Sequence, residues 1–267
     1  MTQMSWKVAM AAVGIAVASA VALPGAAVAA ITAETNGNTL VVNGDSTDNL
    51  INVDWDLYFD LVVISDPVAP FEPLTPGAGC VAAINQGHQN TPELHCIPAG
   101  LRAISVSAGD GDDTVSVGVS RSDEFLSDHL FPVRVSVVGG EGDDDLQTAG
   151  RHGRAFGEAG DDALYGRLGP TYLSGGSGND DLSDPEGGND RLDGGSQGDV
   201  LESFSGRDML IGGDGRDVMR SGSGSDRVLA DDGVRDKRIR CGPSGRDVAL
   251  VDRADPPAQL CERVKTP

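Results

Sequence analysis

The central and C-terminal parts of the chain repeat one pattern of glycine, acidic and apolar positions every nine residues. In GGSGNDDLS, residues 175–183, three glycines are followed by Asp180 and then by Leu182. So much glycine is typical neither of a helix nor of an ordinary strand. With Asp180 as position six and Leu182 as position eight, the same register gives position-eight residues Leu146, Ala155, Leu164 and Leu173 upstream and, after one inserted residue, Leu192, Leu201, Leu210, Met219 and Val228 downstream. A fixed short period predicts stacked structural repeats.

Position six is acidic in most of these units. Asp alternates with Gly153 and Thr171 in the first units and is then kept in each unit. An upstream unit, AGDGDDTVS, adds one aspartate and Val115. The candidate metal ligands are therefore Asp113, Asp144, Asp162, Asp180, Asp190, Asp199, Asp208, Asp217 and Asp226. Beyond them the pattern decays, because Asp236 and Asp247 follow at spacings of about ten and eleven residues.

Two of the units, GGSGNDDLS and GGDGRDVMR, match G-G-x-G-x-D-x-U-x at every defined position, where U is a large apolar residue. This motif resembles the RTX or haemolysin-type calcium-binding repeat. The resemblance covers residues 139–230 firmly and the flanks loosely. It implies a parallel β-roll with Ca²⁺ as its cofactor, held between turns that stack on the same side of the roll and lie two repeat units apart in the chain.

The physical chemistry of the positions agrees with that implication. Glycine supplies turns with positive φ or close backbone approach, and Ca²⁺ takes six to eight oxygen ligands from carboxylates and carbonyls. Position eight should point between two parallel sheets, and only stacking of several coils can bury it. The expected apolar ladder is Leu146, Leu164, Leu173, Leu182, Leu192, Leu201 and Leu210.

The register assigns the aspartates to two sides of the roll. The first side carries Asp144, Asp162, Asp180, Asp199 and Asp217, and the other carries Gly153, Thr171, Asp190, Asp208 and Asp226. With one ion for each adjacent pair of aspartates, about four ions are expected on the first side and about two on the second. Gly153 and Thr171 depart from the motif and leave calcium binding beside them open. Gln197 replaces a turn glycine and should weaken its unit.

Several arginines lie next to position-six acids, and two interpretations are open. They form solvated pairs that reduce repulsion, which is the favoured interpretation, or they compete with the ion and lower its affinity in the last units. The residues concerned are Arg191, Arg207, Arg216, Arg227 and Arg235.

Residues 1–30 predict a secretory signal peptide. Lys7 precedes a long apolar run, Pro24 ends the run, and small residues follow, with cleavage after Ala29 or Ala30. An uncleaved membrane anchor is the alternative, but the run is short for a spanning helix. The chain is expected to be secreted and extracellular, with no membrane association after cleavage.

Residues 31–138 do not follow the repeat and predict an N-terminal β region that leads into the roll as a cap. INVDWDLYFDLVV alternates apolar and polar residues from Ile51 to Val63, including Leu57 and Phe59, and its length suggests a hairpin. AISVS, TVSVGV and VRVSVV predict short strands. GDSTDNLINV contains a weak unit with Asp48 and Leu50. The fold class is thus all-β: this small cap region, a parallel roll at 139–235, and a C-terminal cap at 236–267.

Four cysteines agree with export. Their spacings suit two local disulfides, Cys80–Cys96 in the N-terminal region and Cys241–Cys261 in the C-terminal cap. A zinc site from Cys80, Cys96, His88 and His95 is the alternative, but its spacing does not fit a zinc finger.

Charge and motifs restrict the function. The chain has 20 Lys and Arg against 41 Asp and Glu, a formal net charge of −21, so nucleic acid is a poor partner. The four histidines form no H-E-x-x-H, and the match to G-x-S-x-G at Gly194, Ser196 and Gly198 lies inside a repeat turn, so no enzyme is expected. The expected function is a secreted calcium-binding structural or interaction module. The alternatives are a surface or matrix adhesion protein that binds a cell-surface or polysaccharide partner through its N-terminal β region, and a polysaccharide-modifying enzyme.

Overall fold

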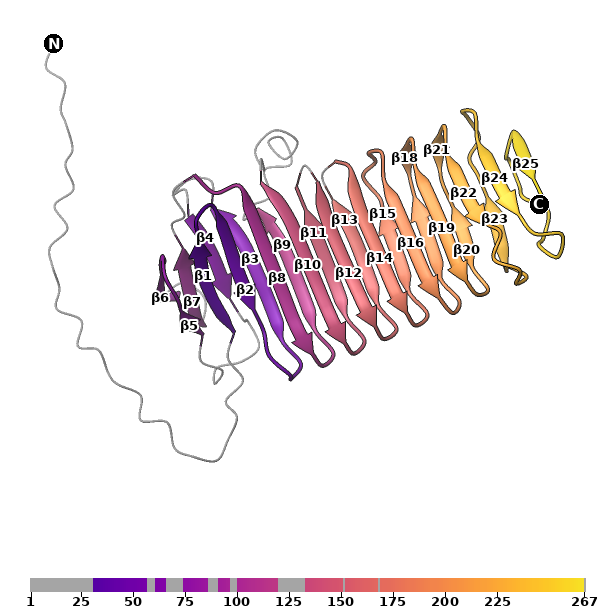
Figure 1. Cartoon of the computed structure of the whole chain (residues 1–267). Helices are drawn as coiled ribbons and strands as arrows, with labels where there is room; N and C mark the ends of the chain where they lie inside the picture. The colour runs from indigo at the N-terminus through magenta and orange to yellow at the C-terminus, as the bar shows by residue number, and fades with distance from the viewer. Residues whose placement is uncertain are drawn as a thin grey trace, which may run out of the picture.

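The computed structural model describes residues 31–56, 61–65, 74–85, 91–96, 100–119, 133–150, 152–167 and 169–266. Within these ranges the chain consists of strands and turns without a helix, so the all-β prediction is confirmed. The strands stack side by side along one axis, from the N-terminal region to the C-terminus, as an elongated roll (Figure 1). The described part therefore also offers no helix that could cross a membrane.

Two parallel-rich sheets form the walls of the roll. Sheet 1 contains, in spatial order, β25 (Arg263–Lys265), β24 (Val248–Val251), β22 (Arg227–Ala230), β19 (Met209–Asp214), β16 (Arg191–Ser196), β14 (Thr171–Ser177), β12 (Gly153–Ala159), β10 (Arg134–Glu141), β8 (Ala103–Asp110), β2 (Thr39–Asn43), β1 (Thr32–Asn36) and β5 (Thr75–Pro76). From β8 to β24, apart from two short strands in the turns, successive strands along the chain alternate between the two sheets, which is the connectivity of a coil.

Sheet 2 faces sheet 1 across the core. Its spatial order is β23 (Arg238–Arg240), β20 (Val218–Arg220), β17 (Val200–Ser203), β15 (Asp181–Asp184), β13 (Ala163–Arg167), β11 (Asp145–Ala149), β9 (Thr114–Val119), β3 (Leu50–Asp56), β4 (Leu61–Ser65), β7 (Thr91–Cys96) and β6 (Cys80–Asn85). Two short strands in the turns, β18 (Ser205–Gly206) and β21 (Ser223–Gly224), pair with each other.

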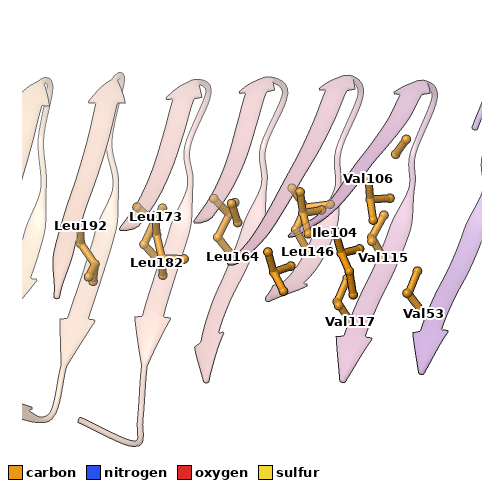
Figure 2. Close-up of a cluster of buried hydrophobic side chains, with 14 of the residues drawn as sticks. Val53, Ile104, Val106, Val115, Val117, Leu146, Leu164, Leu173, Leu182 and Leu192 are labelled. Carbon is orange, nitrogen blue, oxygen red and sulfur yellow. The ribbon is translucent and has the colours of Figure 1, made fainter. Parts of the chain in front are cut away.

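The pairing register places like positions of the repeat above one another. Leu146 pairs with Leu164 and Leu164 with Leu182, so each pair spans two repeat units. Leu182 then pairs with Leu201 across the inserted residue, so the insertion is absorbed outside the strands. The predicted apolar ladder is confirmed, because each of its side chains is fully buried: Leu146, Leu164, Leu173, Leu182, Leu192, Leu201 and Leu210. Figure 2 shows the first five of them between the two sheets.

The N-terminal region supplies the first coils and closes that end of the roll. The predicted hairpin is present as the antiparallel pair β3–β4, although Leu57 and Phe59 lie outside the described residues. The predicted short strands are β8, β9 and β10. Parallel pairing already begins at β2–β8 and β3–β9 and continues into the repeat region, while antiparallel β1, β4, β7 and β6 flank these coils.

One register in this region was wrong. Asp48 and Leu50 were expected at positions six and eight, but Ile51 is the fully buried residue and pairs with Val115. Asn49 therefore occupies position six. The weak motif allowed two registers one residue apart, and a shift of one residue exchanges the inward and outward faces of a strand.

Both predicted disulfides are present. Cys80–Cys96 joins β6 to β7, and Cys241–Cys261 joins the chain after β23 to the segment before β25. The zinc alternative is wrong, since two of its ligands are bonded to each other, and His95 instead contacts Glu93 at 3.0 Å. His88 and the predicted signal segment 1–30 lie outside the described residues.

Truncation of the apolar ladder should destabilise the roll. Leu182→Ala removes a fully buried side chain between two leucines, and we expect a loss of about 2–5 kcal/mol in the free energy of unfolding, measured by chemical denaturation. Ser183→Ala, a half-exposed position on the same strand, is the control and should change little. Equal losses for both variants would contradict a core built on this ladder.

Candidate metal-binding turns

Aspartates of the turns that lead into sheet 2 form a continuous hydrogen-bonded column, here called the first aspartate ladder. Its members are Asp113, Asp144, Asp162, Asp180, Asp199, Asp217 and Asp236. In each step the backbone N–H of one aspartate donates to Oδ1 of the next, as from Asp162 to Asp180 at 2.9 Å. The donor is always the earlier residue in the chain, so the column has one polarity from end to end.

The second carboxylate oxygen of most of these residues is buried and lacks a partner. Oδ2 accepts no hydrogen bond in Asp113, Asp144, Asp162, Asp180, Asp199 and Asp236. These residues are at most 3 % exposed. A buried anionic oxygen without a donor is costly, and repetition at this spacing indicates a missing positive charge rather than an isolated defect.

The position-one glycine explains where such a charge fits. A Cβ on Gly157 would collide with Asp162 Oδ2 and lie 2.7 Å from the carbonyl oxygen of Gly175 in the next turn. A Cβ on Gly139 would meet Asp144 Oδ2 and, at 3.0 Å, the carbonyl oxygen of Gly157. The space left by the missing Cβ is therefore bordered by a carboxylate oxygen and a carbonyl oxygen, the ligands that Ca²⁺ prefers.

The described ranges contain no group of three His, Cys, Asp or Glu side chains that could hold a metal by themselves. Adjacent turns contribute two carboxylates, so a cation here needs backbone carbonyls as well. The position-four glycines bring a further row of carbonyl oxygens close to the next coil, since a Cβ on Gly178 would collide with the carbonyl oxygen of Gly160. The donor set is oxygen only, which suits a hard cation.

Aspartates of the opposite turns form the second aspartate ladder, which consists of Asp190, Asp208, Asp226 and Asp247. Thr171 begins it, donating its backbone N–H to Asp190 Oδ1 at 2.9 Å. Oδ2 of Asp190, Asp208 and Asp226 is again buried without a partner. The predicted assignment of aspartates to two sides is confirmed, and the second ladder lacks a carboxylate at Gly153 and Thr171, as the sequence indicates.

The two ladders differ at position one. In the units of the second ladder, most position-one residues are buried polar residues instead of glycines: Thr148, Asp184, Ser203 and Ser221. Asp184 stacks on Ser203 in the register of β15 and β17, and its Oδ2 accepts a hydrogen bond of 2.7 Å from the Thr171 hydroxyl. The turns of the second ladder therefore leave less space at position one than those of the first, and Asp184 adds one more carboxylate to them.

Burial raises the pKa of the ladder carboxyls. The largest cause is removal from water, neighbouring carboxylates add to it, and the backbone N–H that each carboxylate accepts opposes it. The pKa is about 6 for Asp113, Asp162, Asp180, Asp217 and Asp226 and about 7 for Asp144, Asp190, Asp199 and Asp236. The pKa of Asp208 is raised for the same reason.

Sequence reasoning missed part of both ladders. The irregular spacing of Asp236 and Asp247 suggests that the regular repeat ends before them. Both residues are nevertheless buried members of the ladders, and the extra residues of their units lie outside the stacked positions. Asp255 completes the first ladder by accepting the N–H of Asp236 at 3.0 Å. A search that allowed ten- and eleven-residue units would have found these residues.

An exposed column of aspartates also runs beside the first ladder at position five. Asp48, Asp112, Asp143 and Asp161 each accept the backbone N–H of the position-five residue in the neighbouring coil. In the sequence, the adjacent aspartates in GDGDD, EGDDD and AGDDA indicate this column. This column adds negative charge at the mouth of the same turns.

The turn around Gln197 is kept although this residue replaces a turn glycine. It adopts φ 85°, in the left-handed region that favours glycine, and Asp199 keeps its hydrogen bond from Asp180 at 2.9 Å. Lys237 lies beside this turn, and its positive charge lowers the pKa of Asp199 and Asp217, partly offsetting burial. This unit therefore contains a positive charge of its own that the nonapeptide motif does not show.

The interpretation of the arginines needs correction. Arg191 pairs with Asp193 at 2.8 Å, on the outer face of sheet 1, rather than with Asp190. The ion pairs of the described residues include none between an arginine and a ladder aspartate. Position-seven side chains such as that of Arg191 point outward, away from the turn, which a linear motif does not show.

Fold and site together define a class: a parallel β-roll whose turns present columns of buried aspartates. Comparison with family models agrees, since the model for the RTX calcium-binding nonapeptide repeat (4 copies) matches residues 186–201 and 202–234. Residues 186–234 thus carry RTX-type calcium-binding repeats, as predicted, and the ladders extend beyond the matched segments in both directions. No curated protein matches the chain.

The raised pKa values predict an unusual pH dependence for the metal-free protein. The folded state holds protons on these carboxyls up to about pH 6–7, whereas the ordinary pKa is 3.8. The folded state therefore binds more protons than the unfolded chain between these values, and stability must fall as pH rises through this window. Thermal unfolding after removal of metal by a chelating resin should give a lower midpoint at pH 7.5 than at pH 5. A midpoint that rises over this range would contradict the buried, uncompensated carboxylates.

Proposed function

We propose that this protein is a secreted, non-enzymatic calcium-binding module whose roll is completed by Ca²⁺ in the turns of both aspartate ladders. The observation that carries the proposal is the buried Oδ2 without a partner, which recurs in both ladders. In the first ladder this oxygen faces a carbonyl oxygen across the space of a missing Cβ. A divalent cation there would supply the positive charge that the ladders lack. The residues that would hold it are the ladder aspartates together with turn carbonyls.

The lengths of the two ladders also predict how many ions the roll binds. One ion for each adjacent aspartate pair gives six for the first ladder, from Asp113 to Asp236, and three for the second, from Asp190 to Asp247. This exceeds the four and two expected from sequence because the ladders are longer. Affinities of about 10⁻⁴ to 10⁻³ M would suit an extracellular module.

Two features support an extracellular location. Both disulfides join residues that are close in the fold, and disulfides persist in oxidising compartments. The N-terminal segment has the composition of a cleaved export signal. Binding free energy from calcium would then become available to the fold only after export.

The first test is a titration of residues 31–267 with CaCl₂, followed by far-UV circular dichroism and isothermal calorimetry, with MgCl₂ in parallel. We expect a gain of β signal or of thermal stability with Ca²⁺ and little response to Mg²⁺, which requires small octahedral sites. Several ions should bind for each chain. An equal response to both cations, or none, would contradict the proposal.

A matched pair of substitutions locates the ions. Asp180→Asn keeps an oxygen that can accept the N–H of Asp162 but removes the charge, and it should weaken calcium binding on the order of tenfold at the neighbouring sites. Asp181→Asn makes the same charge change on the exposed, outward side of β15 and should leave the calcium midpoint unchanged. Equal shifts would show that only net charge matters.

Gly157→Ala tests the space between the turns. Its methyl group would occupy the position between Asp162 Oδ2 and the carbonyl oxygen of Gly175, so we expect fewer bound ions and lower stability by calorimetry. Gly118→Ala is the control, because its nearest neighbour would lie 3.9 Å away. Retention of every ion by Gly157→Ala would place the calcium elsewhere.

A further inference from the structure

The outer face of sheet 1 carries a row of alternating arginine and half-buried residues that neither ladder uses. The row occupies position seven, and parallel pairing sets its members side by side from β12 to β25. We call it the arginine row: Arg154, Tyr172, Arg191, Met209, Arg227, Val248 and Arg263. The arginines are exposed, and the residues between them are half-buried.

A second row, at position nine of the same strands, is mostly apolar. Its members, from β10 to β24, are Val138, Phe156, Ser174, Asp193, Ile211, Leu229 and Leu250. Asp193 is the single acid in these two rows, in a chain with 41 acidic residues. On the corresponding outer face of sheet 2, three acids, Asp145, Asp181 and Glu202, are balanced by three arginines, Arg220, Arg238 and Arg240. The two rows of sheet 1, with four arginines and one acid, are therefore net positive in an acidic protein.

Part of this face is held in place. The Phe156 and Tyr172 rings meet edge to face with centroids 5.6 Å apart. The Arg191 guanidinium lies 5.5 Å from the centre of the Tyr172 ring and donates to Asp193 at 2.8 Å. The ion pairs of the described residues include none for Arg154, Arg227 or Arg263, so three charges of the row are available to a ligand.

The spacing of these charges selects among polyanions. Neighbouring strands are about 4.8 Å apart, so the arginines of the row recur about every 10 Å. Because Arg191 is paired with Asp193, the available arginines lie four strands apart from Arg154 to Arg227, about 19 Å, and two strands apart from Arg227 to Arg263, about 10 Å. The net charge of −21 opposes binding of any polyanion, and most strongly of one as densely charged as a nucleic acid. A linear polysaccharide with one carboxylate in each disaccharide has a lower charge density and presents C–H faces of its sugar rings to an aromatic face.

We propose that the outer face of sheet 1 binds a linear acidic polysaccharide, with carboxylates at Arg154, Arg227 and Arg263 and sugar rings against Tyr172 and Phe156. The adhesion alternative raised by the sequence assigned binding to residues 31–138, and the arginine row lies instead along the roll. The proposal needs a folded roll but not an ion at any particular site.

The test compares two triple variants of residues 31–267 in millimolar calcium. Arg154→Gln/Arg227→Gln/Arg263→Gln neutralises the row. Arg220→Gln/Arg238→Gln/Arg240→Gln makes the same charge change on the outer face of sheet 2. Binding to hyaluronan oligosaccharides, which alternate one uronate with one neutral sugar, is measured by calorimetry beside a neutral chitin oligosaccharide and a single-stranded oligonucleotide.

We expect hyaluronan to bind the unmodified protein and the sheet 2 variant alike, the row variant to bind at least tenfold more weakly, and Tyr172→Ala to weaken binding as well. Equal losses in both triple variants, equal binding of the oligonucleotide, or no binding of hyaluronan would overturn the proposal. Dimerisation that depends on the same arginines, seen by analytical ultracentrifugation, would also overturn it by assigning the face to a second copy. The calcium midpoint of both triple variants should be unchanged, which separates failure here from failure of the calcium proposal.

Discussion

The hydrogen bond from the backbone N–H of one turn to the Asp Oδ1 of the next is the interaction on which the roll depends. It fixes the distance between coils, and it forces the other carboxylate oxygen into the protein beside a glycine. The leucine ladder fills the narrow space between the sheets, but like charges stack along both turns. A fold that stacks buried carboxylates needs protons or cations to compensate their charge. The pKa values of the ladder carboxyls are raised for the same reason, because without a metal ion the protonated form is favoured.

The parts of the structure that follow from a strict period were predictable from sequence. A nine-residue repeat with one apolar position determines both the coil and the residues that line its core, and Leu182 or Asp180 can be placed without any structure. The two sides of the roll follow from the same arithmetic. The disulfides could be predicted because only local pairing suits an elongated chain.

The remaining errors arise where the period slips. Asp236 and Asp247 lie in the ladders because extra residues bulge outside the stacked positions, and a rigid count of nine cannot see this. The unit around Asp48 had two possible registers, and burial of Ile51 decided between them. Asp184 replaces the glycine of position one, and Lys237 is an extra residue outside the motif, so their contacts with the turns follow from the fold and not from the motif.

The polarity of the first ladder gives the molecule a direction. Each backbone N–H is capped by the carboxylate of the coil that comes later in the chain, so a nascent coil stays incomplete until its successor has arrived. During synthesis from the N-terminus, each coil would therefore gain this hydrogen bond only after the following coil has been made. The tail ends this dependence: Asp255 accepts the last N–H of the ladder through one oxygen and that of nearby Asp252 through the other. The first ladder is therefore completed only by a residue of the C-terminal segment, Asp255.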